Sequence, residues 1–131
     1  MPLVTERTYP GDVIRWEAEP SYSREEVTFK SGSGSLKVGT VVGRITASGQ
    51  YRASPNAAVV GDEGAEIAVG VLMADVDATA TAAQGVIVRR LAIVNRSNLA
   101  FDTSVDDAAK RQAKVDQLAA AGIGIIAREG A

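Results

Sequence analysis

The sequence predicts a small, mostly β protein with one C-terminal α-helix, which places it in the α+β class. Its 131 residues are enough for one domain with a modest core. Short β-branched segments bounded by Gly, Ser, Pro or Asn recur between residues 27 and 95. One stretch with helical spacing follows, at about residues 105–121. Aromatic residues are only 5%, so the core must consist mainly of Val, Ile, Leu and Ala.

Residues 1–23 are predicted to form an extended N-terminal arm, followed by a β-rich domain over residues 24–131. Pro2, Pro10 and Pro20 prevent a continuous helix and interrupt any long strand ladder. The same composition is typical of a poorly ordered terminus, and the sequence leaves both interpretations open.

The first half of the domain reads as short strands joined by turns. Residues 27–29 form a predicted strand, and the Ser/Gly segment 31–35 forms a loop within the domain. Residues 36–47 are rich in β-branched side chains and contain two glycines, which indicate bends or bulges. Ser48 and Gly49 then predict a turn and a hairpin with the strand that follows.

Two apolar runs dominate the second half. Residues 65–76 are predicted to form a buried strand, because a glycine interrupts the run and β-branched residues recur. Residues 78–83 contain only Ala and Thr and are predicted to be a loop. Residues 85–95 are predicted to form one continuous strand with alternating faces.

The C-terminal helix has a clear start signal. Ser104 is the predicted N-cap, with Asp107 three residues later in the place of a capping-box acid. Apolar residues follow helical spacing from Val105, and Gly122 is the predicted end of the helix. Residues 123–127 are predicted to form a closing strand.

The composition excludes several kinds of chemistry. The chain has no Cys and no His, so disulfides, thiolate nucleophiles, cysteine-bound metal and histidine general bases are absent. The formal charge of −2 provides no basic field for a nucleic-acid backbone. No signal peptide and no membrane-spanning run is visible, so we expect a protein made in the cytoplasm with no direct nucleic-acid or membrane partner.

Three charged pairs are candidates for a special role. Asp75 with Asp77, and Asp106 with Asp107, could in principle perform acid–base chemistry or bind Mg²⁺. A strand leaving the core and a capped helix explain these pairs better, so we predict no catalytic, metal or cofactor residue. Adjacent Arg89 and Arg90 point to opposite faces of a strand, which favours ion pairing or a subunit contact.

A longer pattern resembles a known family. It combines Ser-Arg-Glu-x-Val-Thr within residues 22–32 with Leu-x-x-Gly-Thr-Val-x-Gly-x-Ile-Thr over residues 36–46. Later matches lie at residues 68–72, 88–90 and 93–97. Over roughly residues 22–127 the chain resembles the lambda-type bacteriophage head decoration proteins.

The resemblance implies a β-clip fold and a structural role. Such proteins sit as homotrimers at local threefold positions on the outer surface of an expanded icosahedral head. There they cement capsomers of the major capsid protein against internal DNA pressure. The resemblance also implies that the N-terminal arm becomes ordered on the shell by pairing with capsid strands, and it implies no catalysis, metal or cofactor.

An arm of this kind suits strand addition, in which backbone hydrogen bonds supply affinity and alternate side chains set the register. Trp16 could be the anchoring aromatic, or it could pack on its own domain. The predicted arm contacts with the capsid are Leu3, Val4, Val13, Ile14 and Trp16.

Two functions of other classes remain as alternatives. The first is a biotinyl- or lipoyl-like carrier, or another small β-barrel-like binding module, suggested by residues 36–43. Lys30 and Lys37 lack the neighbours that mark a carrier lysine at a hairpin tip. The second is an enzyme that uses Asp75 and Asp77.

Overall fold

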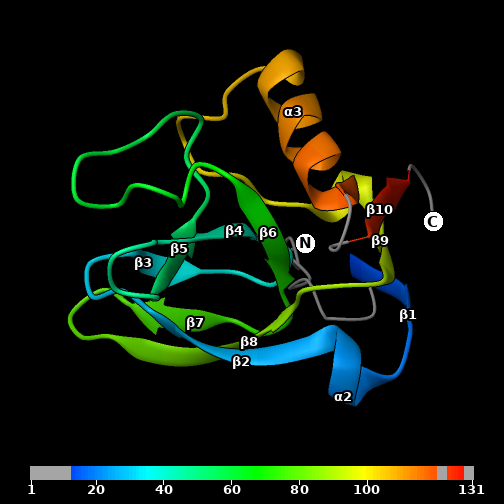
Figure 1. The fold of residues 1–131 in the computed structure, drawn as a ribbon, viewed down its shortest axis with the longest axis horizontal. Helices are drawn as coiled ribbons and strands as arrows, with labels where there is room; N and C mark the ends of the chain where they lie inside the picture. The colour runs from blue at the N-terminus through cyan, green and yellow to red at the C-terminus, as the bar shows by residue number, and fades with distance from the viewer. Residues whose placement is uncertain (1–12, 121–123, 129–131) are drawn as a thin grey trace, which may run out of the picture.

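The computed structural model describes residues 13–120 and 124–128, which are mostly β-strand with one main C-terminal helix (Figure 1). The predicted α+β class is confirmed. In chain order the elements are β1 (Ile14–Glu17), α2 (Pro20–Ser23), β2 (Arg24–Phe29), β3 (Gly34–Leu36), β4 (Val41–Arg44), β5 (Tyr51–Ala53), β6 (Ala68–Leu72), β7 (Val76–Ala78), β8 (Ala83–Val88), β9 (Ala92–Asn95), the 3-10 helix η1 (Arg96–Asn98), α3 (Ala108–Ala119) and β10 (Ile125–Arg128).

The strands form a closed barrel and a separate open sheet. The barrel order is β2-β5-β4-β6-β8, and the three-stranded sheet order is β1-β9-β10. A two-stranded sheet of β3 and β7 lies beside the barrel. Figure 1 shows the barrel on one side of the molecule and the three-stranded sheet on the other, next to α3.

The described residues form two apolar cores, and the strands β4, β6 and β8 contribute to both. Val42, Leu72 and Ile87 belong to the cluster inside the barrel. Their chain neighbours Val41, Val71 and Val88 belong to the cluster between the barrel, the open sheet and α3. Because successive side chains of a strand point to opposite faces, β4, β6 and β8 are covered on both sides. This explains why the run at residues 65–76 is apolar without alternation.

The predicted strand over residues 85–95 is interrupted. It divides into β8 in the barrel and β9 in the open sheet, and Leu91 between them has a φ of 52°. The segment that pairs with these two strands is interrupted at the same point, because α2 separates β1, the partner of β9, from β2, the partner of β8. The backbone N–H groups of Arg89 and Arg90 donate to the carbonyl oxygen of Ser23 across this junction. The two interrupted segments therefore pair twice: β2 pairs with β8 in the barrel, and β1 pairs with β9 in the open sheet.

The last part of the predicted arm differs from the structure. Residues 13–23 are folded onto the domain, because β1 pairs with β9 and Val13 is fully buried in the core beneath the open sheet. Burial of such apolar side chains stabilises a packed strand over a free extended segment. The rest of the predicted arm, residues 1–12, lies outside the described residues.

The C-terminal helix starts later than its predicted first turn. Asp107 is the N-cap and accepts a hydrogen bond from the Lys110 backbone N–H. Ser104 instead accepts from the Asn56 backbone N–H and donates to Asp102, so it fixes a turn before the helix. The predicted end at Gly122 lies outside the described residues, and β10 forms the predicted closing strand.

Candidate functional site

The outer face of the open sheet carries a row of three apolar side chains. Trp16 on β1 and Ile126 on β10 are both paired with Ile93 on the central strand β9. Paired residues of neighbouring strands point to the same face of a sheet, so the three side chains form one row across it. Trp16 is 55% exposed and Ile126 is 45% exposed. We call these three residues the apolar row.

The apolar row faces away from the core because of the register of β1. Ile14 pairs with Val94, but Trp16 pairs with Ile93, so β1 contains one extra residue in a bulge. The inner-face neighbours Ala92, Val94 and Ile125 are buried in the core. A bulge re-aims the side chains that follow it, and here it puts Trp16 opposite Ile93 on the outer face.

The row ends at two strand edges. Among the described residues β1 and β10 each have a strand on one side only. An edge strand presents backbone donors and acceptors that another strand can pair with. Glu17 at the end of β1 accepts a hydrogen bond from the Arg24 Nε at 3.1 Å, which fixes the start of the barrel against this edge. The surface therefore combines exposed apolar side chains with available backbone.

The structure separates the predicted arm contacts into three groups. Trp16 is exposed on the apolar row, whereas Ile14 is half-buried and packs against the core. Val13 is fully buried, so it supports β1 from below and offers no surface to a partner. Leu3 and Val4 lie outside the described residues.

Arg89 and Arg90 are held within the chain. The Arg89 Nη1 donates to Glu25 at 2.5 Å, and this contact raises the pKa of the Arg89 guanidinium. Arg90 donates to the Tyr22 carbonyl oxygen and lies 5.0 Å from the centre of the Tyr22 ring. Both arginines thus join the strands at the junction between barrel and open sheet. The expected ion pairing is present, and a subunit contact of Arg89 and Arg90 stays a prediction.

The paired carboxylates have structural partners. Asp75 Oδ1 accepts from the Val38 backbone N–H at 3.0 Å, and Asp77 Oδ1 accepts from the Thr79 hydroxyl at 2.7 Å. Asp106 pairs with Lys110 at 2.8 Å, while Asp107 caps α3. Within the described residues no three potential metal ligands come together.

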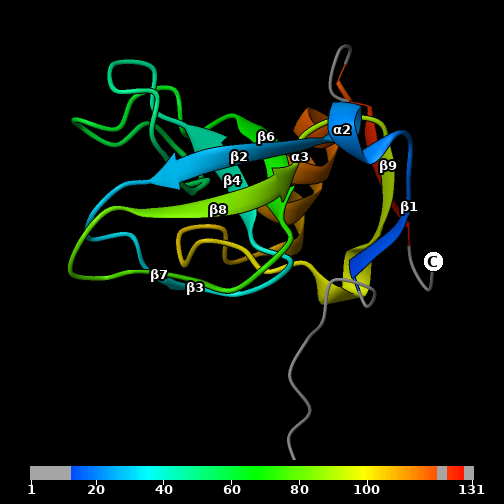
Figure 2. The ribbon, with the colours of Figure 1, turned by 90° about the horizontal axis from the view of Figure 1, so that it is seen from below.

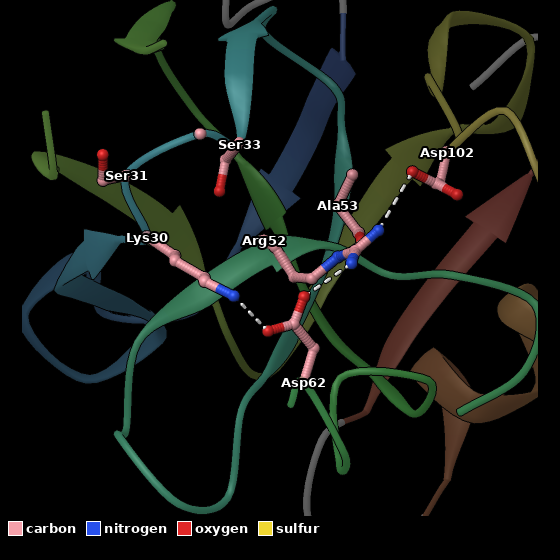
Figure 3. Close-up of a pocket in the computed structure, with 8 residues that line it drawn as sticks. Lys30, Ser31, Ser33, Arg52, Ala53, Asp62 and Asp102 are labelled. Carbon is pink, nitrogen blue, oxygen red and sulfur yellow. Dashed lines mark hydrogen bonds and ion pairs between the residues drawn. The ribbon is translucent and has the colours of Figure 1, made fainter. Parts of the chain in front are cut away.

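A small polar cavity of about 270 Å³ lies at the end of β2 (Figure 3). The buried carboxylate of Asp62 joins the Lys30 Nζ at 2.6 Å and the Arg52 Nη1 at 2.7 Å. Arg52 also reaches Asp102 at 3.4 Å. The Lys30 ammonium and then Arg52 lower the pKa of the Asp62 carboxyl. The two cations and two carboxylates neutralise each other, so the cluster connects strands and loops instead of forming a charged ligand site.

Sequence reasoning missed Ile93 and Ile126 as surface residues. Both lie in predicted strands, and their outward direction follows from alternation within β9 and β10, whereas the bulge in β1 places Trp16 in the same row. The local alternation in the closing strand is the signal that could have found Ile126, because Ile125 beside it is buried.

These features describe a small β-barrel protein with an exposed apolar row on an open sheet, a surface suited to binding another protein. Within the described residues no helix is both long and apolar enough to cross a membrane.

The comparisons with known proteins identify the family. The family model for bacteriophage lambda head decoration protein D matches residues 3–123. The chain belongs to this family of phage head proteins. A search of the curated proteins gives no match. The resemblance noted at residues 22–127 is thereby confirmed, and with it the role of a structural protein that decorates the phage capsid.

Proposed function

We propose that this head decoration protein binds the outer surface of the expanded icosahedral capsid and cements its capsomers against DNA pressure. In this proposal it is made in the host bacterial cytoplasm and binds as a homotrimer at local threefold positions. Its partner is the major capsid protein, and it transforms no substrate and needs no cofactor. Family membership supports the decoration role, and the apolar row is the observation that supports the binding surface.

The apolar row is a suitable contact for a shell protein. Exposed aromatic and aliphatic groups at the centre of an interface supply most of its binding free energy. Trp16 provides the largest apolar surface of the row, and the free edge of β1 lies directly beside it. A capsid strand that adds to this edge would pair with the backbone of β1 and cover the Trp16 ring.

The N-terminal arm is the second part of the proposed contact. Residues 1–12, with Leu3 and Val4, would add as a strand to the major capsid protein. Because Val13 belongs to the core, the arm available to the capsid ends before this residue. Multiple weak contacts of this kind, repeated by three subunits, sum to strong binding.

Binding to expanded heads that lack a decoration protein tests the proposal. Trp16→Ala is expected to weaken co-sedimentation with heads by at least about tenfold, because a central aromatic contact is lost. Ile67→Ala is the matched control, since Ile67 is 49% exposed but lies outside the apolar row. A chain without residues 2–12 measures the arm separately and leaves Val13 and β1 in place.

Two results would contradict the proposal. Heads that do not take up the unchanged chain, or that resist heating equally well without it, would exclude a cementing role. Equal uptake of Trp16→Ala and the unchanged chain would exclude the apolar row as the contact.

A further inference from the structure

The barrel is closed between β2 and β5 by a single residue pair. β2 pairs with β8 over all six of its residues, and Figure 2 shows the two strands side by side. On its other side β2 pairs with β5 only where Phe29 lies opposite Tyr51. A cavity of about 630 Å³ lies along the unpaired part of this side. We call this cavity the seam groove; it is lined by residues 25–28, 44, 48–51 and 89.

The seam groove exposes backbone hydrogen-bonding groups of β2. The Lys30 backbone N–H donates to the Tyr51 carbonyl oxygen at 3.0 Å, so it points towards β5. At the start of the strand the Ser23 carbonyl oxygen accepts from the segment that follows β8, so it points the other way. Backbone groups of alternate residues point to the same side of a strand. The N–H groups of Glu26 and Thr28 therefore face the groove, where no strand among the described residues pairs with them.

The opposite wall of the groove is a turn that satisfies its own backbone. The Ile45 N–H donates to the Gln50 carbonyl oxygen, and the Gly49 N–H donates to the Ile45 carbonyl oxygen, both at 2.8 Å. The Gln50 N–H donates to the Ser48 hydroxyl oxygen at 3.2 Å. The turn thus has a fixed shape and offers none of these donors to β2. An unpaired strand edge beside a preformed wall can accept an added strand with little reorganisation.

The groove carries one cation and one anion that the described chain does not pair. Arg89 and Glu25 neutralise each other, with the Arg89 Nη1 at 2.5 Å from the carboxylate. The Arg44 guanidinium and the Glu26 carboxylate form no hydrogen bond and no ion pair within the described residues. The Arg44 Nη2 lies beside Gly49 of the turn, at the wall that faces β2.

These two charges belong to opposite faces of the barrel wall. Val42 packs inside the barrel, so Arg44, two residues later, starts from the inner face. Val27 also packs inside, so its neighbour Glu26 points to the outer face. Consecutive residues of an added strand point to opposite faces as well. An acidic residue next to a basic one would therefore meet Arg44 on the inner face and Glu26 on the outer face.

We propose that the seam groove binds an extended segment of another protein by strand addition to β2, and that this segment contains adjacent acidic and basic residues. Its backbone pairs with the groups of Glu26 and Thr28 that face the groove. Its carboxylate forms paired, charge-assisted hydrogen bonds with the Arg44 guanidinium. This surface is separate from the apolar row and does not depend on capsid binding.

A capped peptide with the sequence Thr-Val-Glu-Lys-Val-Thr is the probe, added to the isotope-labelled intact chain. The backbone amide signals of Glu26 and Thr28 in the NMR spectrum are expected to shift, and their exchange with solvent is expected to slow. Both changes follow because these N–H groups acquire acceptors. The control peptide Thr-Val-Gln-Gln-Val-Thr is expected to bind at least about tenfold more weakly, since it lacks the charged contacts.

Substitution of the cation tests the charge pattern. Arg44→Gln is expected to weaken binding of the Glu-Lys peptide at least about tenfold and to leave binding of the Gln-Gln peptide unchanged. Because Arg44 is exposed and unpaired within the described residues, the variant should keep the circular dichroism spectrum of the unchanged chain. Arg111→Gln, on the exposed face of α3, is the matched control and is expected to bind both peptides like the unchanged chain.

Three results would overturn the groove as a binding site for such a segment. They are unchanged amide signals of Glu26 and Thr28, signal shifts confined to β1 and β10, and equal binding of the two peptides. Uptake by heads is measured separately, so the two proposals fail independently. Peptide binding without uptake by heads would support the groove and contradict the decoration role, whereas uptake without peptide binding would do the reverse.

Discussion

The barrel and the open sheet solve the problem of strand edges in different ways. The five barrel strands close on themselves, and the side chains inside form one apolar cluster. The open sheet has only three strands, and its edges β1 and β10 have no further strand among the described residues. Closure removes the edges that could pair with other chains, whereas an open sheet keeps them. The difference indicates that the barrel provides stability, and under the proposed function the open sheet provides the contact with a partner.

The same difference is visible in how each region uses its aromatic residues. Phe29 and Tyr51 are buried in the barrel, with ring centres 6.4 Å apart in an edge-to-face arrangement. Trp16 in the open sheet has more than half of its surface exposed. Mutations that separate the two regions should therefore affect stability and binding unequally.

The largest loss of stability is expected for Phe29→Ala. Phe29 is fully buried and is the residue of β2 that pairs with β5, so it lies where the barrel closes. Its removal should reduce the free energy of unfolding by about 3–5 kcal/mol, through lost burial and the cavity that remains. Urea unfolding followed by circular dichroism measures this change. Thr28→Ala on the same strand is the control. An equal loss of unfolding free energy in both variants would argue against a special role of Phe29 in closing the barrel.

A smaller, pH-dependent loss is expected for Asp62→Asn. The Lys30 ammonium and Arg52 hold the pKa of the Asp62 carboxyl below its ordinary value. Its stabilisation is thus present above the unfolded pKa of about 3.9 and is lost as the pH falls through the lower folded value. At neutral pH the variant should lose about 1–3 kcal/mol, because a charged hydrogen-bond partner is removed.

Unfolding by urea between pH 7 and pH 2 tests this expectation. The stability of Asp62→Asn should fall less steeply with acid than that of the unchanged chain. Asp116→Asn, on the exposed face of α3, is the control. Parallel acid profiles for Asp62→Asn and the unchanged chain would show that the Asp62 cluster contributes no pH-dependent stability.

A modest gain of stability is expected at the junction between the two regions. Ser23 is fully buried, and its hydroxyl has no hydrogen-bond partner among the described residues. Ser23→Ala should increase the free energy of unfolding by about 1 kcal/mol, because the desolvation cost of the hydroxyl disappears. Ser21→Ala on the exposed side of α2 should give no gain, since its hydroxyl donates to Glu19. Thermal unfolding of both variants measures these changes. A lower stability of Ser23→Ala would indicate that the Ser23 hydroxyl makes a stabilising hydrogen bond.

The strands and the helix could be predicted from the sequence because their signals are local. The predicted strand at residues 65–76 is present in shorter form as β6 (Ala68–Leu72), and the helical spacing before Leu118 corresponds to α3. The break at Leu91 could not be predicted, because neither Gly nor Pro marks a left-handed conformation there. It is imposed by tertiary structure, since β8 and β9 must serve different sheets.

The surface was harder to predict than the fold. The sequence predicts Trp16 as a contact residue, which stays a prediction, but the place of Trp16 in the apolar row depends on a bulge that shifts the register by one residue. Lys114 gave no signal either, because a lysine in a helix is ordinarily solvated and its three acceptors come from the distant residues 54, 55 and 66.

The smallest effect on stability is expected for Ile126→Thr. The same substitution at the neighbouring Ile125 provides the comparison. The two residues are adjacent on β10, but Ile125 is fully buried in the core and Ile126 belongs to the apolar row. Threonine keeps the β-branched shape that suits a strand. Ile126→Thr should therefore change the free energy of unfolding by less than about 0.5 kcal/mol, as other exposed substitutions do.

Ile125→Thr should instead destabilise the protein by about 1–3 kcal/mol, because a hydroxyl replaces apolar volume in the core. Binding to heads is expected to show the opposite order at a temperature where both variants are folded. Ile126→Thr should bind more weakly, because it removes apolar surface from the contact, and Ile125→Thr should bind like the unchanged chain. Equal binding of all three proteins would show that the outer face of the open sheet is not the contact, whereas a large loss of stability in Ile126→Thr would show that this face supports the fold.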